Sequence, residues 1–195
     1  MTGPSQSQDD ASTPLTTEEQ EQLIPAYITL RHELNEAEQS NILTAEEWAF
    51  GRQRNVLDEA FLANLHQRMF GRVWRWAGTW RRTDRNIGID AYRIPQALRQ
   101  LIDDCRYWID YATYQPDEIA ARLHHRLVFI HPFPNGNGRH ARLAADLLLV
   151  MLERPRFSWG RINLVDAGET RQTYIAALRA ADNHDMAPLL EFVRS

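Results

Sequence analysis

Hydrophobic residues recur at three- and four-residue spacing along most of the chain, the pattern of helices that bury one face. The first such stretch predicts a helix from about residue 16 to about residue 40, with Pro25 as a position where it can kink. Similar patterns, with prolines at several predicted helix starts, indicate more helices further along. These are expected at about 44–48, 58–70, 95–112, 116–130, 138–153, 166–182 and 186–193.

One segment departs from the helical pattern. Residues 80–83 and 87–92 have the character of extended chain, and Gly88 and the Asp90-Ala91 pair supply turn residues. We predict one small β-hairpin here, packed on helices because two strands alone are only marginally stable. The predicted fold class is therefore mostly α, a helical bundle with one small β-hairpin.

Composition narrows the class of protein. A chain of 195 residues fits one domain with an appended arm. Its net charge of −4 gives no overall positive field to recruit nucleic acid, and its longest apolar run, 147–152, is too short to cross a bilayer. Residues 1–15 are polar and lack a signal peptide's apolar core, so we expect a disordered tail and a cytoplasmic protein without a membrane partner.

Chemically active side chains are concentrated in residues 131–142, which read His-Pro-Phe-Pro-Asn-Gly-Asn-Gly-Arg-His-Ala-Arg. The helix predicted to follow is apolar almost all round, which indicates a buried, central helix. Arg139 and Arg142 lie on one face of it. Since two buried guanidinium groups without partners are costly, that face must meet anions, either protein carboxylates or ligand phosphates.

The glycine turn 136–138 precedes this helix, where free backbone N–H groups and the helix dipole favour an anion. His131, just before the turn, can take a proton from a hydroxyl that attacks phosphorus. Phe133 is expected to point into the core and fix the loop. Each residue alone fits a structural role equally well. Together they predict a site that holds a polyphosphate and transfers part of it.

These residues closely resemble the signature of the Fic/Doc family, His-x-Phe-x-Asp/Glu-Gly-Asn-Gly-Arg-x-x-Arg, and the whole chain resembles the branch labelled mobile mystery protein B. Residues 76–81 resemble the segment before the family's flap hairpin, and 174–190 resemble its C-terminal helices. The resemblance implies a helical arm at 16–54, which is a candidate for an inhibitory role, and a Fic domain at 55–195. It implies a protein adenylyltransferase (AMPylase), which moves AMP or another nucleotidyl or phosphoryl group from ATP to a target protein's hydroxyl side chain.

The resemblance also assigns roles to individual residues. His131 would be the general base, and Phe133 would anchor the loop. The flap would dock the target protein through backbone pairing. The phosphate-binding residues would be Gly136, Asn137 and Gly138 for the α- and β-phosphates and Arg139 and Arg142 for the outer phosphates, and the flap would comprise Asn86, Ile87, Gly88 and Ile89.

One position departs from the signature. Asn135 stands where the family has Asp or Glu, the carboxylate that binds Mg²⁺. Because a neutral amide ligates only through its carbonyl and Mg²⁺ prefers anionic oxygens, we expect weakened Mg²⁺ binding. Three outcomes stay open: slow AMP transfer, another phosphoryl or nucleotidyl chemistry, or a catalytically weakened module that only binds nucleotide or regulates.

A built-in inhibitor is a further hypothesis from the resemblance. Many members carry an inhibitory helix, Ser/Thr-x-x-x-Glu-Gly/Asn, and residues 29–34 match its first part, with Leu34 departing from Gly/Asn. Glu33 is the inhibitory candidate, expected to pair with Arg142. Glu36 and Glu38 are rivals on the same predicted helix, and a solvated acidic face is an equally good interpretation.

Two remaining clusters have competing interpretations. Tryptophans 74, 76 and 80 are interleaved with arginines, which suits either single-stranded nucleic acid or core packing; the acidic balance favours the core, and nucleic acid is not an expected partner. His124 and His125 point about 100° apart on a helix, so packing is preferred over a metal site. Tyr174 is only a weak candidate for an adenine contact.

Overall fold

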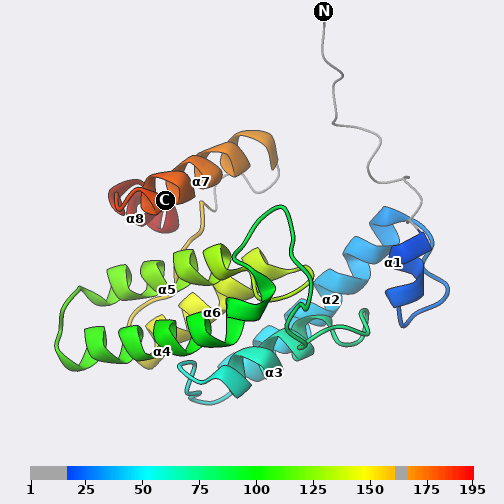
Figure 1. The fold of residues 1–195 in the computed structure, drawn as a ribbon, viewed down its shortest axis with the longest axis horizontal. Coiled ribbons are helices and arrows are strands. Elements are labelled where there is room, and N and C mark those ends of the chain that lie inside the picture. The colour runs from blue at the N-terminus through cyan, green and yellow to red at the C-terminus, as the bar shows by residue number, and fades with distance from the viewer. Residues whose placement is uncertain (1–16, 161–166) are drawn as a thin grey trace, which may run out of the picture. The chain divides into compact units, whose positions relative to one another are not determined.

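The computed structural model describes residues 17–160 and 167–195, so the predicted tail at 1–15 and the predicted helix start at 166 lie outside the described residues. The fold is mostly helical, as predicted (Figure 1). It divides into two compact units, one with residues up to 52 and 63–79, the other with 53–62 and 80–195. Over the described ranges, no helix combines the length and apolarity needed to span a membrane.

The first unit contains α1 (Thr17–Gln22), α2 (Arg31–Phe50) and the C-terminal part of α3 (Glu59–Phe70). The prediction of one helix over 16–40 and another over 44–48 was wrong: the chain is non-helical between α1 and α2, and α2 continues to Phe50. Pro25 cannot donate a helical hydrogen bond. Leu23 forms an antiparallel bridge with Trp74, and the Ile24 N–H donates to the Val73 carbonyl at 2.9 Å. A long-range pairing therefore replaces the expected helix.

The tryptophans of the first unit are packing residues. Trp74 is 3% exposed, and its indole N–H donates to Glu38 at 2.6 Å. Trp76 stacks on Trp74 with ring centroids 5.1 Å apart. In the second unit, Trp80 packs on Phe133 at 4.7 Å. These contacts support the core interpretation of the Trp/Arg segment over a nucleic-acid surface.

The second unit contains α4 (Ile94–Asp110), α5 (Pro116–Ile130), α6 (Asn137–Met151), α7 (Ala167–Asp182) and α8 (Ala187–Arg194), preceded by the short 3₁₀ helix η1 (Ala91–Arg93). Helix α5 packs against both α4 and α6, and α8 packs on α7 and α5 (Figure 1). Leu148 and Ala144 of α6 are fully buried. The prediction of a buried helix after the glycine turn is confirmed.

The predicted β-hairpin is not formed. Residues 80–90 consist of bends and irregular backbone, and no strand pairing occurs there within the described chain. Arg81, only 4% exposed, donates instead to the carbonyls of Thr83 and Ile89, groups that a hairpin ladder would have used. The buried Arg81 guanidinium thus holds the segment that was expected to form a hairpin. The predicted flap residues Asn86, Ile87, Gly88 and Ile89 lie in irregular backbone.

Candidate active site

The signature residues form the connection between α5 and α6. Helix α5 ends at Ile130, and the next residue, His131, has a left-handed backbone with φ 52° and ψ 60°. Gly136, with φ 78°, precedes α6, and its carbonyl accepts the first helical bond of α6, from His140 N–H at 3.0 Å. The N–H groups of residues 137–139 therefore lie at the helix start, outside its hydrogen-bond ladder, where a helix favours an anion.

The side chain of Asn137 closes this loop. It is 3% exposed, its Oδ1 accepts from the Phe133 N–H at 2.8 Å, and its Nδ2 donates to the Phe133 carbonyl at 2.9 Å. Phe133 is fully buried and meets the edge of His140 at 5.0 Å. Asn137 thus fixes the loop through its side chain, which leaves only its backbone N–H to face an anion.

The imidazole of His131 is held in its neutral form. Burial lowers the pKa of His131 below its usual value, and the nearby Arg81 and Arg85 guanidinium groups lower it further, opposed by a hydrogen bond to the Val128 backbone. A histidine whose pKa lies below its usual 6.5 is mostly unprotonated near pH 7. The His131 side chain, expected from the sequence to be the general base, is thus mostly in the form that can accept a proton.

Arg81 joins the flap to this loop, a role that the sequence analysis missed. Its Nε donates to the His131 carbonyl at 2.7 Å, and its Nη2 donates to the carbonyls of Ile130 and Ile89. Gly88, with φ 92°, passes so close that an added Cβ would lie 2.5 Å from the His131 Cβ. Only glycine fits there. Positions 68–93 contain six other arginines, so nothing in the sequence distinguishes Arg81 as the residue that joins the flap to the loop.

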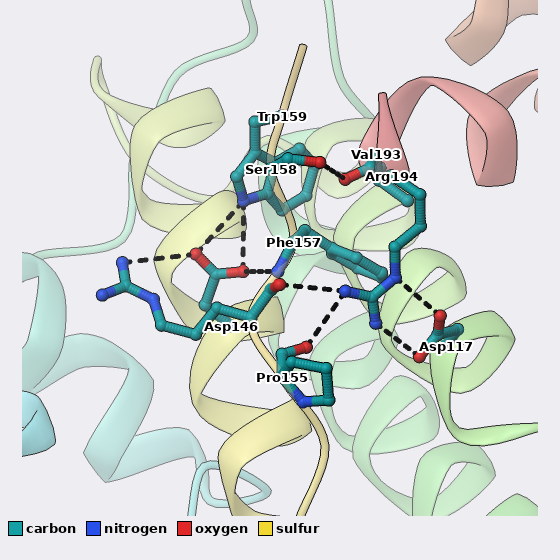
Figure 2. Close-up of polar contacts among 9 residues, drawn as sticks. Asp117, Asp146, Pro155, Phe157, Ser158, Trp159, Val193 and Arg194 are labelled. Atoms are coloured by element: carbon teal, nitrogen blue, oxygen red, sulfur yellow. Dashed lines mark hydrogen bonds and ion pairs between the residues drawn. The ribbon is translucent and has the colours of Figure 1, made fainter. Parts of the chain in front are cut away.

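Arg139 and Arg142 are both half-buried on α6, and Arg142 donates a hydrogen bond to the Tyr174 hydroxyl. Asp146, one turn further along α6, serves another purpose (Figure 2). Its carboxylate accepts from the Phe157 N–H and the Trp159 indole N–H at 3.1 Å and pairs with Arg156 at 3.5 Å. Asp146 therefore fastens the segment that follows α6.

The same segment is fastened a second time by the C-terminal helix. Arg194 forms a two-bond pair with Asp117, at 2.6 and 2.7 Å, and donates to the carbonyls of Pro155 and Arg156 (Figure 2). These contacts link α8 to the start of α5. They hold the stretch 155–159 that carries Trp159, whose ring contacts His124.

Position 135 does not build a magnesium site. Asn135 is exposed, and its Oδ1 accepts from the adjacent Gly136 N–H at 2.7 Å. In the described part of the chain, no cluster of three or more His, Cys, Asp or Glu side chains is arranged for a metal ion. A neutral amide whose oxygen already accepts a hydrogen bond fits Mg²⁺ poorly, so the residues present do not supply the family's metal ligand.

The other histidines near the signature have packing roles. His124 is fully buried with Nε2 2.9 Å from the Tyr174 hydroxyl, and His125 pairs with Asp182 at 2.8 Å. His140 is 1% exposed, with Nε2 3.0 Å from the Leu62 carbonyl. Burial lowers the pKa of His140 to about 4, so it stays neutral inside the core.

The inhibitory candidate Glu33 has a structural task in the first unit. Its carboxylate accepts the N–H groups of Thr29 and Leu30 at 2.9 and 3.1 Å, which caps the start of α2. These hydrogen bonds lower the pKa of Glu33. Its rival Glu38 bonds Trp74 instead. Glu33 and Arg142 belong to different units, and their pairing stays a prediction.

A profile of the Fic/DOC family matches residues 56–149, the part of the chain that contains the whole loop described above. The chain belongs to the Fic/DOC family. It is 30% identical over 136 residues to the protein adenylyltransferase fic-1 of Caenorhabditis elegans, an alignment that covers 68% of this chain and 25% of that protein. The chain thus spans about a quarter of the length of this curated relative.

Solved structures of the Fic family have the same fold. A Fic-1 fragment from C. elegans superposes with a TM-score of 0.63 at 25% identity, covering 80% of this chain and 48% of that one. BepC from Bartonella tribocorum, solved with bound AMPPNP, gives 0.65 at 18% identity and covers 92% and 97%. The narrower resemblance to the mobile mystery protein B branch stays a prediction, as do the division into 16–54 and 55–195 and the cytoplasmic location.

Proposed function

We propose that this Fic protein transfers the AMP moiety of ATP to a hydroxyl side chain of a target protein. The observation that carries the proposal is the α5–α6 connection, where one closed loop holds a neutral, half-buried His131 beside the N-terminal end of α6. Relatives about 30% identical that are named protein adenylyltransferases support it.

The proposed reaction uses the chain's own groups in stated roles. The target's hydroxyl oxygen attacks the α-phosphorus of ATP while the His131 imidazole accepts its proton. The bond from the α-phosphorus to the bridging oxygen breaks, and pyrophosphate leaves. The N–H groups of Asn137 and Gly138 would face the α- and β-phosphates, and Gly136, whose own N–H donates to Asn135 Oδ1, would turn the backbone toward them. Arg139 and Arg142 would bind the outer phosphates.

Docking of the target is assigned to the flap. Ile87 is 61% exposed, and the irregular backbone at 86–89 offers its outer edge to an extended peptide. The inner side is already bound, since the Ile89 carbonyl accepts from Arg81. A target strand that pairs with the outer edge would bring its hydroxyl toward His131, which lies directly behind Gly88.

The test compares two positions of a radioactive label. The full chain is incubated with a cell lysate and ATP labelled at either the α- or the γ-phosphorus. The proteins are then separated by gel electrophoresis, and the label on each is detected by autoradiography. We expect stable label from α-labelled ATP and none from γ-labelled ATP. Label from the γ-position would instead indicate phosphoryl transfer. ATP binding in equilibrium dialysis without any transfer would favour the alternative, a nucleotide-binding or regulatory module weakened at Asn135.

Restoring the family's carboxylate should raise activity. We predict that Asn135→Asp, which keeps the side chain's shape and its acceptor for the Gly136 N–H, increases transfer at limiting Mg²⁺ about tenfold, the effect of 1.4 kcal/mol of added metal binding. Transfer measured against Mg²⁺ concentration checks this. Asn55→Asp, a change outside the site, is the control. Equal Mg²⁺ dependence in the wild type and Asn135→Asp would count against a metal-starved site.

Inhibition by Glu33 has its own prediction. Glu33→Gln removes the charge but keeps an oxygen that can cap α2, so it separates the two tasks of this side chain. If Glu33 pairs with Arg142, we expect ATP binding and transfer to rise about fivefold or more, a coupling of roughly 1 kcal/mol. Glu36→Gln, on the exposed side of α2, is the matched control. Unchanged binding and transfer in Glu33→Gln would refute the pairing.

A further inference from the structure

Three helices of the second unit bring one side chain each to a common point. Tyr174 of α7 lies between Arg142 of α6 and His124 of α5: its hydroxyl accepts a hydrogen bond from the Arg142 guanidinium and is 2.9 Å from His124 Nε2. His124 is fully buried, and Tyr174 and Arg142 are half-buried. None of these contacts is needed by the proposed transfer itself.

The Tyr174 hydroxyl can bind both neighbours at once. A guanidinium can only donate, and a phenol oxygen can accept that bond while it also donates to, or accepts from, a histidine nitrogen. Burial lowers the pKa of His124 to about 3 and keeps its ring neutral, so one ring nitrogen is a donor and the other an acceptor. Either tautomer lets Nε2 bond to the Tyr174 hydroxyl at 2.9 Å. Tyr174 therefore bridges Arg142 and His124.

The His124 end of this bridge is fixed to the scaffold. The His124 ring packs against Trp159 with centroids 4.7 Å apart. The Trp159 indole N–H in turn donates to both carboxylate oxygens of Asp146 at 3.1 Å (Figure 2). Asp146 and Arg142 are one helical turn apart on α6. The chain of contacts thus begins and ends on the same helix, which gives His124 a defined position from which to orient the tyrosine.

We propose that Tyr174 and His124 are positioning residues that hold the Arg142 guanidinium in the orientation in which it receives the outer phosphates of ATP. The proposal rests on the proposed function for the role of Arg142. A free arginine side chain samples many rotamers, and ordering it on binding costs affinity. A hydroxyl that fixes the guanidinium beforehand removes part of that cost. Tyr174 would then act on the phosphate end of the nucleotide and not on its adenine.

The experiment compares nucleotides of different phosphate number. Dissociation constants of ATP and AMP are measured by calorimetry for the wild type, for Tyr174→Phe and for the control Tyr111→Phe. Tyr111 directly follows α4 and is 71% exposed. We expect Tyr174→Phe to weaken ATP binding about five- to tenfold, as for one lost hydrogen bond to a charged group, and to leave AMP binding within twofold. Tyr111→Phe should change neither.

A second pair of variants tests the histidine. His124→Gln keeps an oxygen that can accept the Tyr174 proton, whereas His124→Leu does not. We expect ATP affinity near the wild-type value for the glutamine variant and the Tyr174→Phe phenotype for the leucine variant, with thermal melts recorded to show that each is folded. The test is whether the glutamine variant binds ATP more tightly than the leucine variant. Because both variants lose the imidazole ring, a loss of stability that they share does not produce this difference.

Three outcomes would overturn this inference, and a fourth would overturn only the proposed function. Equal weakening of ATP and AMP by Tyr174→Phe would assign the tyrosine to the adenosine end, and unchanged ATP binding would show that Arg142 needs no positioning. Wild-type protein that binds ATP no better than AMP would remove the phosphate contact itself. A chain that binds ATP through this bridged arginine but transfers no label would overturn the proposed function while leaving the inference intact.

Discussion

Replacing His131 by alanine is expected to slow AMP transfer by about 10²- to 10⁴-fold, the range for loss of a positioned general base. His131 directly follows α5 and precedes the loop that leads to the start of α6. ATP affinity should change little, because the proposed function assigns the phosphates to other groups. Single-turnover transfer from α-labelled ATP and calorimetric ATP binding separate the two effects. His184→Ala, an exposed histidine beyond α7, is the matched control.

The pH dependence of transfer provides a second readout for His131. Because its pKa is lowered, the base form persists below the usual 6.5, so the acid limb of the rate profile should lie below pH 6.5. Arg85→Gln removes a positive charge that lowers this pKa and should move the limb toward higher pH. A wild-type limb above pH 6.5, or full activity of His131→Ala, would exclude the imidazole as the base.

Replacing Phe133 by alanine is expected to lower the free energy of unfolding by about 3–5 kcal/mol. The ring is fully buried, touches Trp80 and His140, and its backbone is held at both N–H and C=O by Asn137. Because the cavity would open beside the phosphate loop, activity should fall with stability. Urea unfolding followed by circular dichroism measures the change.

The control for Phe133 is Phe129, which is 44% exposed on α5. Phe129→Ala should cost less than about 1 kcal/mol, since a surface side chain leaves no closed cavity. If Phe133→Ala cost as little as Phe129→Ala, the loop would have to relax into the vacated space. In that case Phe133 could not be the residue that fixes the loop.

Much of the second unit could be predicted because its signals are local. Pro95 and Pro116 lie in the first turns of α4 and α5, and α5 spans Pro116–Ile130 as expected. The glycine turn and the apolar stretch after it gave the start of α6 and its burial. In these places the spacing of a few neighbouring residues decides the structure, so the sequence is sufficient.

The errors arose where distant residues decide the structure. The helix expected over 16–40 stops because Leu23 pairs with Trp74, about fifty positions away. The hairpin expected at 80–92 is replaced by the bonds of Arg81 to carbonyls that include Ile130 and His131, which also lie far along the chain. Neither partner is visible in a short sequence window, and an isolated arginine looks like any surface charge.

The contact of Gly88 with His131 has a consequence for substrate selection. The flap backbone passes the imidazole at a separation that leaves no room for a Cβ, and Arg81 holds both sides of that contact from within. If a target peptide docks at the flap as proposed, its distance from His131 is preset before the target arrives. We then expect this chain to separate the short serine and threonine side chains from tyrosine by the reach of the hydroxyl, and insertions in the flap, rather than changes at His131, to alter that choice.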